Sequence, residues 1–173
     1  NNNTLKPELI KKLNIHPWNQ LVEIIQRIFR TGKLPQKMCW GILVLIPKGT
    51  SKHRGIGLLD SIWKPCSAII NKRITNKIQY HDSLHGFREN RGTGTEILEA
   101  KLLVSKSESE NKTLFQAFID LSKTYDSISR TKIMEILEGY GVGPICLRLI
   151  KTFWDNQTVA TRKSNFYGHP FIV

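Results

Sequence analysis

The sequence has few acidic residues. It holds 14 Asp and Glu against 26 Lys and Arg in 173 residues, a formal net charge of +12 at pH 7. Most of this surplus lies between Arg30 and Arg91, where twelve basic residues face three acidic ones. Concentrated positive charge is typical of a surface that binds a polyanion, above all nucleic acid. A solvated basic face or a ribosome-like packing surface has the same composition, so charge alone leaves the partner open.

Long apolar runs and paired cysteines are also missing. The longest apolar candidate, Gly41–Pro47, has the length of a strand and falls far short of the roughly 18 residues of a membrane span. We therefore expect no membrane span, and the N-terminal residues do not have the pattern of a signal peptide. Cys39, Cys66 and Cys146 are scattered in apolar surroundings without zinc spacing. We expect core thiols in a reducing intracellular compartment, nucleus or organelle.

The hydrophobic pattern predicts a mixed fold of the α/β or α+β class. Forty per cent of the residues are apolar, enough for a real core. Apolar residues at helical spacing predict helices over about 4–13, 17–31, 61–80, 95–107, 129–139 and 144–155, and apolar runs predict strands at 40–46, 56–59, 114–119, 157–161 and 166–173. In the helix over 95–107 we expect four side chains to face inward, those of Ile97, Leu98, Leu102 and Leu103. The expected sheet is small and mostly antiparallel, with helices around it.

The strands at 40–46 and 56–59 flank a basic loop, which predicts a β-hairpin with positive charge at its tip. Lys48 offers a point charge there and Arg54 a bidentate fork, and the two together suit a triphosphate. A solvated hairpin tip is the alternative interpretation.

A glycine-rich stretch follows at Leu84–Thr95. Gly86, Gly92 and Gly94 let a ligand approach the backbone closely, and Arg88 and Arg91 suit phosphate. The stretch lacks the Gly-Lys-Ser/Thr ending of a P-loop, which argues against a nucleotidase.

The strand at 114–119 ends at Asp120, and Tyr125 follows after four residues. A carboxylate at the end of a buried strand is costly unless a cation lies on it, and a hard divalent cation such as Mg²⁺ would supply that compensation. Asp120 as a plain turn cap is the other interpretation, and local sequence leaves both open.

These motifs, taken in order, resemble reverse transcriptases of the non-LTR retrotransposon and group II intron kind. The resemblance rests on Leu-Ile-Pro-Lys48, Arg54-Gly-Ile-Gly-Leu-Leu, Gly-Phe-Arg88 and Phe-Ile-Asp120-Leu-Ser-Lys-Thr-Tyr-Asp. It implies a right-hand polymerase architecture. Residues 1–113 would form the helices and basic hairpin of the fingers, and residues 114–173 a partial palm with the first catalytic motif.

The resemblance also implies roles for single residues. Asp120 would be the catalytic carboxylate that binds Mg²⁺, and Tyr125 the aromatic under the sugar of the nucleotide. Lys48 and Arg54 would bind the triphosphate of a dNTP. The template strand would be contacted by Gly86, Phe87, Arg88 and Arg91.

The sequence departs from the family pattern at three positions. Thr124 replaces a small Ala, so its hydroxyl is expected to crowd the nucleotide pocket. Gly55 and Gly57 replace Pro and Ser, which is expected to loosen the second strand of the hairpin.

One expected motif is absent: the sequence has no Tyr-x-Asp-Asp after Asp126, where the remaining acids are Glu135, Glu138 and Asp155 on predicted helices. Two-metal phosphoryl transfer needs more than one carboxylate. We therefore expect a fragment of an RNA-directed DNA polymerase that is inactive by itself. Its expected partners are an RNA template, a DNA primer and dNTP. The alternative is a retained structural or RNA-binding subunit of a larger ribonucleoprotein or organellar assembly, in contact with other protein subunits. A plain basic interaction domain would leave the family order of the motifs to chance.

Overall fold

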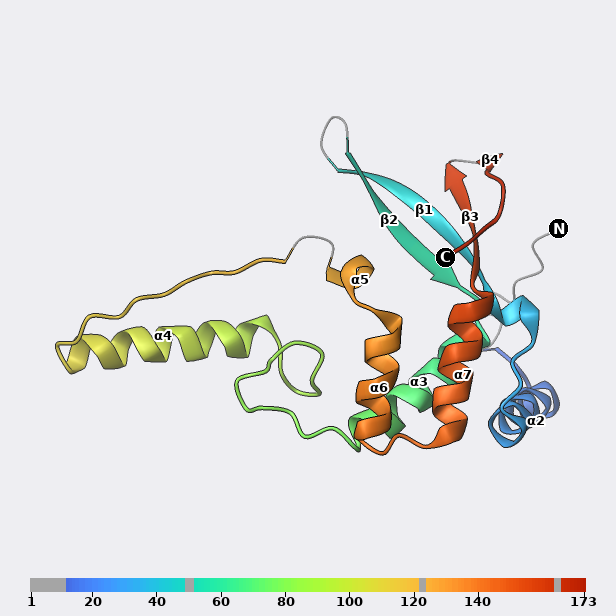
Figure 1. The fold of residues 1–173 in the computed structure, drawn as a ribbon, viewed down its shortest axis with the longest axis horizontal. Coiled ribbons are helices and arrows are strands. Elements are labelled where there is room, and N and C mark those ends of the chain that lie inside the picture. Colours follow the sequence, from blue (N-terminus) through green and yellow to red (C-terminus); the bar gives the residue numbers. More distant parts are fainter. Residues whose placement is uncertain (1–11, 49–51, 122–123, 164–165) are drawn as a thin grey trace. The chain divides into compact units, whose positions relative to one another are not determined.

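The computed structural model describes residues 12–48, 52–121, 124–163 and 166–173. Along the chain these form α2 (Ile15–Thr31), the 3₁₀-helix η1 (Gln36–Cys39), β1 (Trp40–Lys48), β2 (Lys52–Leu59), α3 (Trp63–Thr75), α4 (Thr93–Ser109), α5 (Thr124–Ser127), α6 (Arg130–Gly139), α7 (Pro144–Asn156), β3 (Thr158–Lys163), β4 (Phe166–Tyr167) and β5 (Phe171–Ile172) (Figure 1). The mixed fold class is confirmed. The helix predicted over 4–13 lies almost wholly outside the described residues.

The chain divides into two compact units, and each is described by itself. Unit 1 comprises residues 1–77 and 131–173, and unit 2 comprises residues 78–130. Unit 2 is thus an insertion in the sequence of unit 1. The division into fingers at 1–113 and palm at 114–173 concerns roles and stays a prediction.

The sheet belongs to unit 1 and has the order β2-β1-β3-β4, with β5 also paired to β3. Strands β1 and β2 form the predicted hairpin, antiparallel from Gly41↔Leu59 to Lys48↔Lys52. Strand β3 pairs antiparallel with β4 and β5. It pairs parallel with β1, from Trp40↔Thr158 to Val44↔Arg162. The small, mostly antiparallel sheet is confirmed, with one parallel pair at its centre.

Local signals set the ends of the helices in unit 1. Gly32 has φ 64° after α2, and its N–H donates to the carbonyl of Ile28 at 2.8 Å, which is a glycine C-cap. Before α3, the Asp60 carboxylate accepts the N–H of Ile62 at 2.8 Å. Helix α3 ends at Thr75, five residues short of the predicted end.

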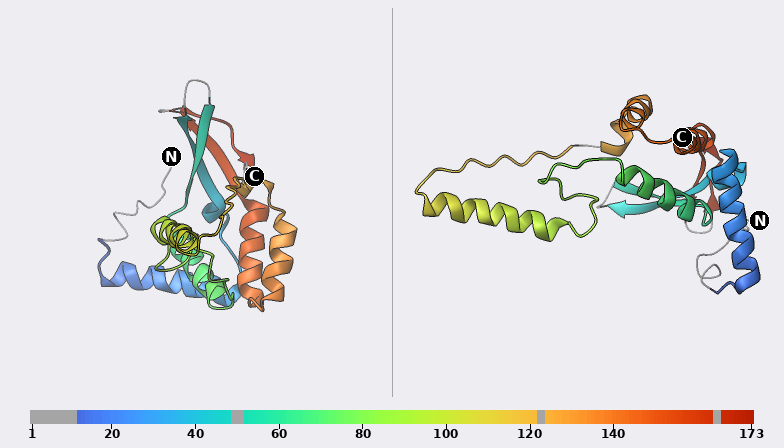
Figure 2. Two further views of the ribbon diagram at one scale, coloured as in Figure 1. Left: turned by 90° about the vertical axis from the view of Figure 1, so that its left-hand side faces the viewer. Right: turned by 90° about the horizontal axis from the view of Figure 1, so that it is seen from below.

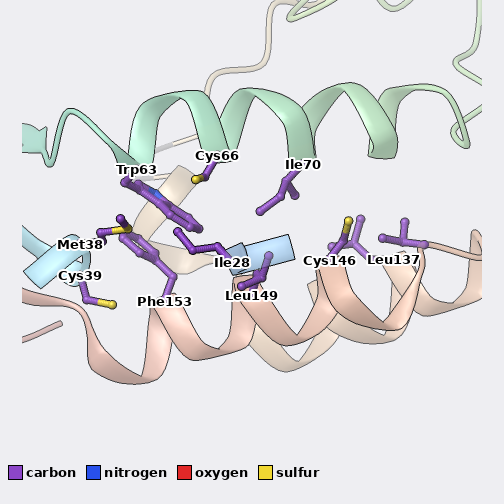
Figure 3. Packing of buried hydrophobic residues seen from close by; sticks show 11 residues of the cluster. Ile28, Met38, Cys39, Trp63, Cys66, Ile70, Leu137, Cys146, Leu149 and Phe153 are labelled. Atoms are coloured by element: carbon purple, nitrogen blue, oxygen red, sulfur yellow. The ribbon is translucent and has the colours of Figure 1, made fainter. Parts of the chain in front are cut away.

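The core of unit 1 lies between α2, η1, α3, α6 and α7 (Figure 3). Leu149 and Cys66 are fully buried there, and all three thiols are buried and unpaired, as predicted. Helix α7 packs against η1 and α2. Among the described residues, no helix combines the length and the apolar character that crossing a bilayer needs.

The strand predicted at 114–119 is not formed. The segment is extended but has no strand partner within the described part of the chain, and Phe115 and Phe118 are 90% and 92% exposed. A strand needs a neighbouring edge for its backbone hydrogen bonds and a layer to cover its apolar side chains. The sequence supplies the β propensity of this segment, and its surroundings here supply neither edge nor cover.

Helix α4 forms as predicted but is not packed as predicted. Its four supposed inward residues are 51–61% exposed, and none of its residues is buried: Ile97, Leu98, Leu102 and Leu103 all face solvent. The helix is stabilised at its start, where the Thr95 hydroxyl accepts the N–H of Gly92 at 3.0 Å. Figure 2 shows the regular helix and the extended segment that follows it.

Candidate nucleotide and nucleic-acid sites

The basic hairpin of unit 1 is a regular two-stranded ribbon. Arg54 is exposed and lies directly opposite Ile46 across the two strands. Lys48 ends β1 two residues beyond Ile46. Because successive residues of a strand alternate between faces, the positions of Lys48 and Arg54 share one face of the ribbon. The side chain of Lys48 and the tip at 49–51 lie outside the described residues.

Strand β2 is paired with β1 along its whole length, and the expected loosening of this strand stays a prediction. Gly55 makes room for a neighbour. A Cβ at this position would lie 2.9 Å from Cδ1 of Leu43 and 3.4 Å from its Cγ. At Gly57 a Cβ would meet nothing within 4 Å. The first glycine is therefore explained by the Leu43 side chain and the second has no steric explanation.

The two arginines of the glycine-rich stretch hold their own loop together. Nη1 of Arg88 donates to the carbonyls of His81 at 3.0 Å and Leu84 at 3.3 Å, and its guanidinium lies 5.5 Å from the ring centroid of Tyr80. Nη1 of Arg91 donates to the carbonyl of Asp82. A guanidinium carries five N–H donors, so these bonds occupy part of its capacity.

Two residues of this loop adopt a backbone conformation that the sequence did not indicate. Phe87 has φ 59° and Asn90 φ 60°, in the left-handed region that asparagine tolerates and bulky residues rarely adopt. The glycines of the stretch are not among the positive-φ residues. The Phe87 side chain is 96% exposed, so the loop presents an aromatic ring to solvent.

Asp120 and Tyr125 lie near the C-terminal end of the sequence of unit 2. Asp120 is exposed on the extended segment, and Tyr125, on the short helix α5, is 77% exposed. The Thr124 hydroxyl donates to the carbonyl of Leu121 at 2.9 Å, so this hydroxyl is bonded within its own turn. The structure describes neither residues 122–123 nor the side chain of Asp126.

Within the described residues, no three His, Cys, Asp or Glu side chains gather into a group that would hold a metal ion. Asp120 supplies one carboxylate, whereas two-metal chemistry uses ligands that bridge and flank both ions. The described residues therefore do not amount to a complete Mg²⁺ site, and no reaction step is routed through one.

The sequence comparisons define the class of protein. The profile described as "Reverse transcriptase (RNA-dependent DNA polymerase)" matches residues 46–171, so the chain belongs to the reverse transcriptase family. Among curated proteins it is similar to the "Retrovirus-related Pol polyprotein from type-2 retrotransposable element R2DM" of Drosophila melanogaster, at 26% identity over 130 residues. That alignment covers 72% of this chain and 12% of the relative.

All the predicted site residues fall inside the matched range. Lys48 and Arg54 belong to unit 1, whereas Gly86, Phe87, Arg88, Arg91, Asp120 and Tyr125 belong to unit 2. The structure brings together the two hairpin positions and, separately, the four loop residues. A residue that sequence reasoning missed is His85, which is 8% exposed and bonded to α4. The sequence signal for it is a pair of polar residues, Thr95 and Glu99, which lie four residues apart on one helix face.

Proposed function

We propose that this chain forms the nucleotide-facing and template-facing part of a reverse transcriptase of the non-LTR retrotransposon type. Members of the family act on an RNA template, a primer and nucleotides. The observation that carries the proposal is the match over residues 46–171, because this range includes every predicted site residue. The similarity to a protein described as a Pol polyprotein from a type-2 retrotransposable element favours the non-LTR type.

The hairpin is the proposed site for the triphosphate of a dNTP. Arg54 is exposed and shares its face of the ribbon with the position of Lys48. A lysine point charge beside an arginine fork matches the charge and the geometry of adjacent phosphates. Regular pairing up to Lys48↔Lys52 makes the ribbon a defined support for both residues.

The loop at Gly86–Arg91 is the proposed template contact. Phe87 offers a ring for base stacking, which is tolerant of sequence because every base has a π-face. Arg88 and Arg91 keep N–H groups beyond those bonded to the loop carbonyls, and these suit phosphate oxygens. The arginines thus serve the loop and the ligand together.

Asp120 and Tyr125 are the proposed metal ligand and sugar-facing aromatic. The 173 residues hold no Tyr-x-Asp-Asp motif, so we propose that they bind primer–template and nucleotide but do not transfer nucleotides by themselves. When bound, Mg²⁺ would neutralise the phosphate charge that Asp120 faces.

A second function is favoured by one observation, the exposed apolar side chains of α4. A helix with this much exposed apolar surface is typical of an interaction site. It would suit a retained subunit that binds structural RNA and other proteins, with Asp120 idle.

The test is binding of the purified chain to an RNA–DNA primer–template across a salt series. Wild type is compared with Arg88→Ala/Arg91→Ala and Lys48→Ala/Arg54→Ala. The matched control, Lys106→Ala/Lys151→Ala, removes two charges from exposed helix positions outside both candidate sites. Because each phosphate contact contributes about 0.7–0.9 to the slope of log K against log salt, loss of the loop arginines should lower the slope by about 1–2.

Arg88→Lys/Arg91→Lys separates the two roles of the arginines. Lysine keeps the charge but does not reproduce the guanidinium fork. Near wild-type slope with weaker affinity would indicate that the loop bonds matter. No binding of the wild type at low salt would overturn the proposal. Binding to structured RNA with no preference for primer–template would favour the second function.

A further inference from the structure

His85, near the start of the glycine-rich stretch, is buried, and both of its ring nitrogens are hydrogen-bonded. Nδ1 lies 3.0 Å from the Thr95 hydroxyl and Nε2 lies 2.5 Å from Oε2 of Glu99. An ionised carboxylate only accepts hydrogen bonds, so opposite an ionised Glu99 the Nε2–H of His85 is the donor of this hydrogen bond. The charged acceptor makes this a strong bond, and the Glu99 side chain is 47% exposed while that of His85 is 9% exposed.

The Thr95 hydroxyl joins the two ends of the loop. Besides its contact with His85, this oxygen accepts the N–H of Gly92 at 3.0 Å and donates to the carbonyl of Gly92 at 2.7 Å. His85 and Gly92 are therefore fixed at one side chain of the first turn of α4. Glu99, one turn further on, holds the His85 ring from its other edge.

What lies between the two fixed ends is the candidate template contact. Phe87 projects from the loop with φ 59° and an exposed ring. A bulky residue keeps this conformation only where its surroundings impose it. Arg88 closes the loop on one side by donating to the carbonyls of His81 and Leu84. The hydrogen bonds of the His85 ring attach this closed loop to helix α4.

We propose that His85 is a positioning residue for template binding. It does not touch nucleic acid. Its hydrogen bonds to Thr95 and Glu99 hold residues 85–92 in the conformation that presents Phe87, so that the loop is ordered before the template arrives. Ordering a loop during binding weakens affinity, and a loop that is ordered beforehand avoids this loss. The inference rests on the proposed template contact of Gly86–Arg91.

The binding experiment uses His85→Ala, Phe87→Ala and the double variant, with the same RNA–DNA primer–template. His16→Ala is the matched control, because His16 is an exposed histidine whose ring bonds to Gln20 on α2. We expect His85→Ala to weaken binding about tenfold, and by no more than Phe87→Ala does. The slope of log K against log salt should stay unchanged, because no phosphate contact is lost. The double variant should bind no more weakly than Phe87→Ala.

Three further variants exclude a merely structural effect. His85→Gln places an amide whose NH₂ group can donate to Glu99, so it should recover most of the lost affinity. Glu99→Ala and Glu96→Ala each remove one negative charge from α4, but only Glu99 bonds to His85. We expect weaker binding for Glu99→Ala alone. Equal binding of His85→Ala and wild type, or full additivity with Phe87→Ala, would overturn the proposal.

A second measurement tests the anchor without nucleic acid. Long-range ¹H–¹⁵N spectra of the wild type should show Nε2 of His85 as a proton-bearing nitrogen. Amide exchange at 86–92 should accelerate in His85→Ala while amides of α7 keep their rates. If the wild type fails to bind primer–template, the proposed function fails and the role in template binding with it. A bare Nε2 or unchanged exchange would show that the anchor itself is wrong.

Discussion

The rings of Trp63 and Phe153 stack in parallel, with centroids 4.3 Å apart and planes inclined by 4°. Trp63 begins α3 and Phe153 lies near the end of α7, so this contact joins distant parts of the sequence at the core of unit 1. Both rings are buried. Phe153→Ala removes the stack and leaves a cavity, which should lower the free energy of unfolding by about 3–5 kcal/mol.

Urea denaturation followed by Trp fluorescence and circular dichroism would measure this change. Phe166→Ala is the control, because that ring is 82% exposed on β4 and its loss should change stability by less than about 0.5 kcal/mol. Equal effects of the two variants would contradict the packing described for unit 1.

The two glycines of β2 predict opposite responses to alanine. Gly55→Ala places a methyl group 2.9 Å from the Leu43 side chain and should lower stability by about 1 kcal/mol. Gly57→Ala meets open space and should leave stability unchanged or raise it by about 0.5 kcal/mol, since alanine restricts the unfolded chain. Thermal denaturation of both variants decides the order, and a larger loss at Gly57 would contradict the register of the hairpin.

The turn after α2 depends on a glycine for two reasons. Gly32 has φ 64°, and a Cβ there would lie 2.9 Å from Cδ of Arg148 on α7. Gly141 has φ 71° but nothing within 4 Å of a Cβ. Gly141→Ala should therefore lose about 1 kcal/mol through backbone strain alone, and Gly32→Ala should lose more. In an Arg148→Ala background the excess should disappear, which a double-mutant cycle of unfolding free energies would measure.

The Cys66 thiol predicts a stability change in alkali. Burial raises its pKa from the ordinary value of 9.0 to about 11, and the negative charge of Asp60 adds to the shift. Between these pH values the unfolded chain loses the thiol proton while the folded chain keeps it. Stability from this group is thus complete below pH 9 and falls as pH rises toward 11, by up to about 1.4 kcal/mol per pH unit. Cys66→Ala should make the pH dependence over this window less steep in denaturant titrations, and an unchanged slope would contradict the prediction.

Elements with strong local signals were predictable from sequence. The apolar spacing of α2, its end at Gly32 and the hairpin around Lys48 are determined by residues close in sequence, and the structure confirms them. Helix α7 likewise begins at Pro144, as the predicted range 144–155 has it, and proline suits the first turn of a helix.

The remaining features depend on residues far away in the chain. The segment around Phe118 has the β propensity of a strand, but pairing depends on an edge that local sequence does not specify. The apolar stripe of α4 predicts a face and not what covers it. The candidate site residues could be identified by motif order. The hydrogen bonds of His85 and the left-handed backbone of Phe87 are visible only in the folded structure.

The parallel pairing of β1 with β3 has a consequence for how the chain is made. Trp40 pairs with Thr158, so all of unit 2 emerges from the ribosome between the two central strands of the sheet. At about 5–20 residues per second, the hairpin β1–β2 waits roughly 5–20 s for β3. During that interval one edge of β1 is open to any other extended segment. Chaperone binding to the nascent hairpin, or slowed synthesis through residues 60–157, would set how much of the chain reaches the folded sheet.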